Sequence, residues 1–151
     1  MKANCDICKS LDTDIERLLV TDHWIVTVAP DQGYLGRCYV TLRQHRQHLH
    51  ELDPAEWRDL AIVVSQLEHA ITAAFAATLY NWACLMNLAY QDASPVPHVH
   101  WHLRPRYRAP VIFKGIEYRD KDFGYHYDSD QRRLLDASGV AAITAAIESK
   151  L

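Results

Sequence analysis

No stretch of the sequence reaches the roughly 18 consecutive apolar residues that a membrane-spanning helix needs. The first residues, 1–5, also contain no apolar run of signal-peptide length, so we expect no membrane partner and a cytoplasmic location. The chain lacks a large excess of charge of either sign. Its formal net charge of -3 gives no general attraction to nucleic acid, and we expect no nucleic-acid partner.

Internal repeats and low-complexity segments are absent, and disulfides are not expected. The 151 residues are 49% hydrophobic and 23% charged, which suits one compact domain, residues 1–151, whose core needs no covalent staples. Of the four cysteines, Cys5 and Cys8 are better interpreted as thiols or metal ligands in a reducing compartment. Cys38 and Cys84 lie in apolar, strand-like stretches, where a small buried thiol is the default interpretation.

Apolar patterning predicts two strands and a long helix in the first half of the chain. Residues 24–28 and 38–43 are rich in β-branched and aromatic side chains and are separated by turn-forming residues, so we expect an antiparallel pair. The sequence Asp53-Pro-Ala-Glu is typical of a helix N-terminus with the aspartate as its cap. Apolar residues at spacings of three and four then carry this helix to about Thr78.

Two further strands and a second helical region follow. Residues 82–88 and 98–104 are predicted to be neighbouring strands joined by a proline-bearing loop. An extension over about 109–151 begins with a segment that wraps the body or a partner subunit, and it ends in a helical region with a break at Gly139. This order predicts an α+β fold, with a mostly antiparallel sheet, one long helix and a C-terminal helix.

Three histidines alternate with apolar residues in the segment His98-Val99-His100-Trp101-His102. Because successive side chains of a strand point to opposite faces, the three imidazoles share one surface while the residues between them pack on a core. A lone histidine on an exposed strand is usually only solvated, but three in alternation indicate a site. Such a row can supply metal ligands, general acids or bases, or a nucleophile toward phosphorus, and the spacing does not choose among these uses.

The residues around this row resemble a known family. The segment 98–106, HVHWHLRPR, resembles the signature of the histidine triad (HIT) superfamily of nucleotide hydrolases and transferases. Upstream, residues 36–45 (GRCYVTLRQH) are similar to the family's glycine, strand, basic residue and additional site histidine. Asn87 matches the asparagine that ends the strand before the family's phosphate loop. The resemblance covers roughly residues 5 to 106.

This resemblance implies a HIT-like α+β domain that pairs as a homodimer and binds a nucleotide against the triad. His100 would attack the α-phosphorus to give a nucleotidyl-histidine that water hydrolyses, and a backbone carbonyl near His98 would set its tautomer. His102 and His45 would contact the phosphate or the leaving group. A neutral imidazole nucleophile also suits near-neutral pH on chemical grounds. The implied substrates are dinucleoside polyphosphates or adenylated conjugates.

The two-cysteine spacing of the N-terminal clip, residues 1–10, suits one half of a tetrahedral zinc site. Two ordinary thiols near a chain end are the alternative interpretation. Some bacterial members of the resembled family complete such a site with the upstream histidine and the first triad histidine. The resemblance thus implies a structural zinc whose ligands are Cys5, Cys8, His45 and His98.

Several departures from the family pattern lie around the nucleotide. The family's phosphate loop has a glycine shortly before the first histidine, whereas residues 92–97 have no glycine and two prolines, with Ser94 as the nearest hydroxyl. The acidic residue that grips the ribose in relatives falls near Ala29, and Asp31 is the nearest substitute. Arg104 shares the strand parity of the triad, so it either faces the phosphates or is an ordinary surface arginine. The predicted nucleotide-binding residues are Asn87, Ser94, Arg104 and Asp31.

Two rival functions stay open at this point. The altered loop suits a non-catalytic nucleotide-binding or interaction module on the same fold. The histidine row suits a metalloenzyme in which all three histidines bind a catalytic metal. Tight mononucleotide binding without turnover would favour the non-catalytic module. Metal analysis of the wild type and of a Cys5→Ser variant tests the metalloenzyme, because loss of all metal in the variant would indicate the structural site instead.

Overall fold

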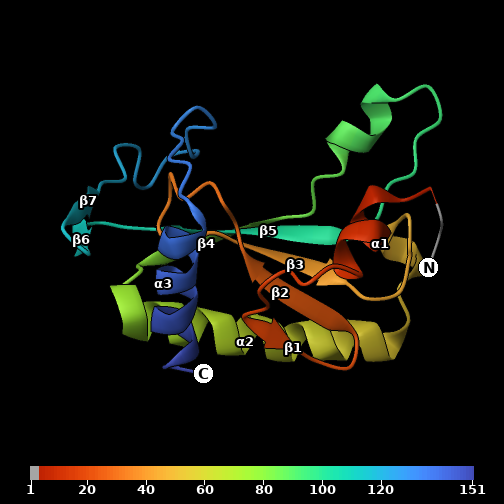
Figure 1. Ribbon diagram of the computed structural model, residues 1–151, viewed down its shortest axis with the longest axis horizontal. Helices are drawn as coiled ribbons and strands as arrows, with labels where there is room; N and C mark the ends of the chain where they lie inside the picture. The colour runs from red at the N-terminus through yellow and green to blue at the C-terminus, as the bar shows by residue number, and fades with distance from the viewer. Residues whose placement is uncertain (1–3) are drawn as a thin grey trace.

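A five-stranded antiparallel sheet forms the centre of the computed structural model, which describes residues 4–151 (Figure 1). The sheet has the spatial order β1-β2-β3-β5-β4, so that β5 lies between β3 and β4. Its strands are β1 (Leu19–Val20), β2 (Trp24–Val28), β3 (Cys38–Leu42), β4 (Leu79–Ala83) and β5 (His100–Arg106). Every neighbouring pair is antiparallel, which confirms the predicted sheet. The first three residues of the predicted clip lie outside the described residues.

The long helix α2 (Pro54–Phe75) covers one face of this sheet (Figure 1). The Asp53 carboxylate accepts hydrogen bonds from two amides of the first turn, and the Glu56 carboxylate accepts one from the Asp53 amide at 2.8 Å, which is the predicted capping box. The helix ends at Phe75, because the next residue, Ala76, has a φ of 58° and so cannot continue the right-handed turn. The predicted end at Thr78 is therefore a few residues too late.

Alternate strand side chains and the inner face of α2 form the core. The inward-facing residues are fully or almost fully buried, and they include Trp24, Val26, Val40, Leu103, Val63, Leu67 and Ile71. The opposite face of the sheet carries polar and aromatic side chains instead. The short helix α1 (Asp6–Leu11) and the 3-10 helix η2 (Asn87–Gln91) stand over that open face, on the side away from α2 (Figure 1).

The strand predicted over 82–88 is displaced in the structure. Strand β4 begins at Leu79, which pairs with Arg106, and ends at Ala83, which pairs with His102. The apolar residues after Ala83 leave the sheet and lead into η2, so the prediction was wrong over this part. Its pairing with the histidine strand is confirmed. A second 3-10 helix, η1 (Leu49–Glu51), precedes α2.

The C-terminal extension contains a hairpin and a helix. The strands β6 (Val111–Phe113) and β7 (Ile116–Tyr118), which the sequence did not predict, form a hairpin on the opposite side of the molecule from α1 (Figure 1). The predicted C-terminal helix is α3 (Ala137–Glu148), which contacts α2 and β2. Gly139 does not break it, because its amide donates to the capping Asp136 carboxylate at 2.8 Å. Among the described residues, no helix combines the length and apolarity needed to cross a membrane.

Candidate functional site

The histidine row lies on the open face of the sheet, beneath a cleft of about 1190 Å³. The register of β3 and β5 sets Tyr39 opposite His102 and Thr41 opposite His100, and all four side chains line the cleft. Other parts of its wall come from α1, β2, the segment after β4 and the start of α3. The strand alternation predicted from the sequence therefore places His100 and His102 at the floor of a large cleft.

His100 is held in one tautomer. Its Nδ1 lies 2.8 Å from the backbone carbonyl oxygen of His98. A carbonyl can only accept, so Nδ1 carries a proton and donates it, and in the neutral tautomer of the ring the lone pair is then on Nε2. His100 therefore has the form that a nucleophilic imidazole requires.

His102 is kept neutral by its surroundings. Burial, together with the nearby His100, Arg104 and Arg37, lowers its pKa to about 4. Its ring stands edge-on to Tyr39, with 5.2 Å between the ring centroids. Both ring nitrogens are buried without a hydrogen bond of ordinary geometry among the described residues, although the Leu85 backbone raises the pKa slightly. A neutral imidazole in this position can give a phosphate oxygen one N–H donor.

A second group of side chains collects where α1 meets the start of β5. The ligand atoms of Cys5, Cys8, His45 and His98 all lie within 4.8 Å of one another. The Cys8 Sγ lies 3.5 Å from the His45 Nδ1 and 3.4 Å from the His98 Nδ1, and the two Nδ1 atoms are 3.3 Å apart. Ligands at about 2.0–2.3 Å in a tetrahedron lie roughly 3.3–3.8 Å from one another, so this cluster fits a zinc site.

The second ring nitrogen of His98 supports this interpretation. Its Nε2 donates to the Leu42 carbonyl at 2.7 Å, so that the Nδ1 lone pair faces the thiols. Burial lowers the pKa of His98 to about 4, which keeps the ring neutral as a ligand must be. The helical turn of α1 brings Cys5 and Cys8 together, because residues three apart share a face. His100 and His102 lie outside this group.

The predicted nucleotide-binding residues fall in three different places. Asn87 and Ser94 are exposed and line the cleft. Arg104 lies one step beyond His102 on the same face of β5, is 9% exposed, and stacks on Tyr127 with 4.1 Å between its Cζ and the ring centroid. The Asp31 carboxylate accepts from the Arg37 guanidinium at 2.7 Å and from two backbone amides, so its oxygens are already used within the fold.

Sequence reasoning missed parts of the cleft. Tyr39 has the same strand parity as Thr41, so its position could have been found from the pairing of β3 with the histidine strand. Leu135, just before α3, and Ala137 and Val140, in its first turn, line the cleft although they lie more than 30 residues beyond the triad. Their contribution depends on how the C-terminal extension folds back, for which the local sequence gives no signal.

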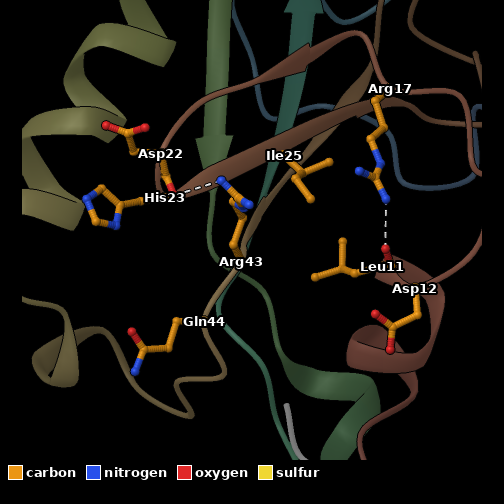
Figure 2. Close-up of a pocket in the computed structure, with 8 residues that line it drawn as sticks. All are labelled: Leu11, Asp12, Arg17, Asp22, His23, Ile25, Arg43 and Gln44. Atoms are coloured by element: carbon orange, nitrogen blue, oxygen red, sulfur yellow. Dashed lines mark hydrogen bonds between the residues drawn. The ribbon is translucent and has the colours of Figure 1, made fainter.

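A smaller hollow of about 530 Å³ lies beside α1 and the β1–β2 turn (Figure 2). Arg17 donates there to the Leu11 carbonyl at 2.9 Å, and Arg43 donates to the Asp22 carbonyl at 3.0 Å. These cations bind backbone carbonyls and so tie neighbouring segments together. The triad histidines lie outside this hollow, so the cleft above β3 and β5 is the candidate site.

Solved structures of low sequence identity share this fold over most of the chain. A Hit-like protein involved in cell-cycle regulation from Bartonella henselae is 17% identical, with a TM-score of 0.73, over 100% of this chain and 98% of that one. A Zn-bound histidine triad family protein from Mycobacterium smegmatis is 18% identical, with a TM-score of 0.62, over 97% and 94%. The diadenosine triphosphate hydrolase of Plasmodium falciparum, in complex with Cyclomarin A, is 18% identical, with a TM-score of 0.60, over 91% and 76%.

Sequence comparison identifies the family itself. No curated protein sequence matches the chain significantly. The family model of the HIT domain matches residues 16–109, more than half of the chain, and this range includes His45 and the triad. The chain therefore belongs to the HIT domain family.

Proposed function

We propose that this protein is a nucleotide hydrolase or nucleotidyl transferase that attacks a nucleoside α-phosphate through a nucleotidyl-histidine intermediate on His100. The observation that carries this proposal is the hydrogen bond from His100 Nδ1 to the His98 carbonyl at 2.8 Å, in a ring that lines the cleft. That bond leaves Nε2 with the lone pair that must form the new bond to phosphorus.

The reaction divides into two displacements. In the first, His100 Nε2 attacks the α-phosphorus, and the bond from phosphorus to the leaving group breaks with its electron pair on the leaving atom. In the second, water attacks the same phosphorus and loses a proton, and the bond from phosphorus to Nε2 breaks with its electron pair on Nε2, which restores the neutral imidazole. His102 contacts the phosphate or the leaving group and donates an N–H to charge that develops there.

The cleft has room for more than a mononucleotide. Its volume of about 1190 Å³ exceeds the roughly 300–1,000 Å³ of ordinary ligand pockets. Asn87 and Ser94 supply polar groups at its rim. A structural relative is a diadenosine triphosphate hydrolase, which supports dinucleoside polyphosphates as substrates alongside adenylated conjugates.

We also propose that a structural zinc occupies the cluster of Cys5, Cys8, His45 and His98. A closed set of two thiolates and two imidazoles is a common structural zinc site, and one relative is Zn-bound. When bound, the ion would supply a rigid link between α1 and the start of β5. Because the Nδ1 of His45 lies 3.5 Å from Cys8 Sγ, we assign His45 to this group. A cytoplasmic location, which we propose as well, would keep both thiols reduced.

The chain is proposed to pair as a homodimer. Strand β4 is an edge of the sheet, and an edge strand offers unpaired backbone groups to another chain. Large apolar side chains also reach solvent on β4, where Leu79 is 40% exposed, and on α2, where Trp57 is 40% and Ile62 55% exposed. Light scattering after size-exclusion chromatography tests this assembly, and a monomer at micromolar concentration would contradict it.

A substrate panel tests the proposed activity. Diadenosine polyphosphates and adenosine phosphoramidates are incubated with the wild type, with His100→Ala and with His69→Ala, whose ring is exposed on α2 away from the cleft. We expect release of adenosine monophosphate by the wild type and by His69→Ala, and loss of it in His100→Ala. Unchanged turnover in His100→Ala would refute the nucleophile. Tight mononucleotide binding without turnover would favour the non-catalytic alternative.

A further inference from the structure

Two guanidinium groups lie beside His102 on the open face of the sheet. Arg104 follows His102 by two residues on β5, so both side chains project from the same face. Arg37 precedes Tyr39 by two residues, and its Cζ lies 5.6 Å from the centroid of the Tyr39 ring. Both cations are near enough to act on the His102 ring electrostatically. They therefore form a positively charged border next to the triad.

The charges of this border do not balance among the described residues. The Asp31 carboxylate faces both arginines, but its bound partners are the Arg37 Nη1 at 2.7 Å and the amides of Gly33 and Arg133. Within residues 4–151, the Nη1 of Arg104 is buried without a hydrogen bond, and so is the Nε of Arg37. One carboxylate thus offsets two cations, and a buried, unsatisfied guanidinium is costly unless a partner completes it.

The aromatic neighbour of Arg104 does not use its hydrogen-bond donors, and the Nη1 has no hydrogen-bond partner among the described residues. Tyr127 stacks on the guanidinium with 4.1 Å between the Cζ and the ring centroid. Stacking uses the face of the guanidinium, while its N–H groups point outward in the plane of the group. The side chain is 9% exposed, so this arrangement holds it in place and limits competing water. Such a pre-ordered, planar fork suits a phosphate group.

We propose that Arg104 and Arg37 form an anion subsite that binds a phosphate of the leaving group, next to His102. This inference rests on the proposed nucleotidyl transfer to His100 and adds to it a substrate preference. The enzyme then favours substrates whose leaving group is itself a nucleoside phosphate over substrates with an uncharged amine in that position.

The subsite adjoins the cleft, although neither arginine is among the residues that line it. His102 and Tyr39 both line the cleft, and the two arginines border these same two side chains. From a substrate phosphorus next to His100, the next side chains on the same face along β5 are His102 and then Arg104. A leaving group that carries further phosphates would meet the unsatisfied donors in that order, whereas ammonia or a small amine would not reach them.

The kinetic test compares two substrates that share adenosine and differ in the leaving group. For Arg104→Gln we expect kcat/KM for a diadenosine polyphosphate to fall about 10- to 100-fold, the usual effect of losing a charge-assisted hydrogen bond. For adenosine phosphoramidate, kcat/KM stays within about twofold of wild type. Arg104→Lys keeps the positive charge but loses the planar guanidinium, so we expect its kcat/KM for the polyphosphate to lie between the values of wild type and Arg104→Gln. Equal losses on both substrates, or no loss on either, would overturn the subsite.

A binding measurement separates this proposal from the proposed activity. Pyrophosphate is titrated calorimetrically into the wild type, into Arg104→Gln and into Arg108→Gln, an exposed arginine on the same segment. We expect Kd to rise at least about 10-fold only in Arg104→Gln, with the thermal midpoint unchanged. If no nucleotide is turned over but this dependence is found, the activity is wrong and the anion subsite stands. Binding that does not depend on Arg104 refutes the subsite.

Discussion

His98 and His100 are joined by one hydrogen bond, in which the Nδ1 of His100 donates to the backbone carbonyl of His98 at 2.8 Å. The side chain of the same His98 lies in the cysteine and histidine cluster, with its Nδ1 3.4 Å from Cys8 Sγ. One residue thus contacts the proposed nucleophile through its backbone and the candidate metal ligands through its ring. The orientation of His100 therefore depends on how firmly the start of β5 is held.

A covalent adduct on His100 is the first expected outcome. When wild-type protein is mixed with a diadenosine polyphosphate and quenched during turnover, mass spectrometry of its peptides should find adenylate on His100. His100→Gln should show no adduct and lose at least about 10³-fold in kcat/KM, because the lost bond to phosphorus has no substitute. An adduct on another residue would assign the nucleophile to that residue. Full turnover without any adduct, while His100 is still required, would replace covalent catalysis with general-base catalysis.

Several strands and the start of the long helix could be predicted, because the residues within each segment are enough to favour that structure. The β-branched and aromatic residues of 24–28 and the alternation along 98–104 identify strands, and the capping sequence at Asp53 identifies the start of α2. The metal cluster was anticipated through a family resemblance, since Cys5 and Cys8 supply only half of it in sequence. Its two histidines come from segments that meet only in the folded sheet.

Other features depend on contacts between distant segments and had no local signal. The apolar run after Ala83 looks like more strand, yet β4 stops where its pairing with β5 stops, at His102. Arg104 looked equally like a surface residue, because Tyr127, which covers it, belongs to the C-terminal extension. The excess positive charge beside His102 likewise appears only when Arg37 is placed next to Arg104.

Removing one thiolate should remove the metal and destabilise the protein. We expect purified wild type and Cys84→Ser, whose thiol lies outside the cluster, to contain about one zinc per chain, and Cys8→Ser to contain none. A metal present at about 1,000 times its Kd adds about 4 kcal/mol, so the thermal midpoint should fall by roughly 10 °C. Elemental analysis and calorimetry measure both effects.

The histidine triad itself provides the control for the metal experiment. His100→Ala should keep its zinc, because His100 lies outside the cluster. Loss of zinc in His100→Ala together with retention in Cys8→Ser would mean that the row, and not the clip, binds the metal. That result would support the metalloenzyme alternative.

The neutral state of His102 has a consequence for stability against pH. Burial, together with His100, Arg104 and Arg37, lowers its pKa to about 4 in the folded protein, below the ordinary value near 6.5. As the pH falls below 6.5, His102 becomes protonated in the unfolded chain but stays neutral in the folded chain. The free energy of unfolding therefore decreases until about pH 4. Allowing for solvent screening, we expect this residue to account for about 1 kcal/mol or less between pH 7 and 5.5.

Urea unfolding at both pH values measures this effect by comparing wild type with His102→Gln, which cannot titrate. The variant should lose less stability than wild type as the pH is lowered. NMR gives a direct check, because the His102 ring protons should not shift between pH 7 and 5.5. Titration of those protons near pH 6.5 would show that the ring is charged at mildly acidic pH and is not the neutral donor proposed here.

The buried ion pair of Arg106 and Asp120 anchors the C-terminal extension to β5. Both side chains are at most 1% exposed, and Arg106 also donates to the carbonyls of Asp122 and Tyr125 at 2.7 and 3.1 Å. Arg106→Met leaves the Asp120 carboxylate buried and unpaired, so we expect a loss of about 3–5 kcal/mol in the free energy of unfolding. Replacing both residues by apolar ones should restore part of this loss, because no charge is then left unpaired. Urea unfolding of the two single variants and the double variant gives the coupling energy, and simple additivity of the two losses would show that the pair does not act as a unit.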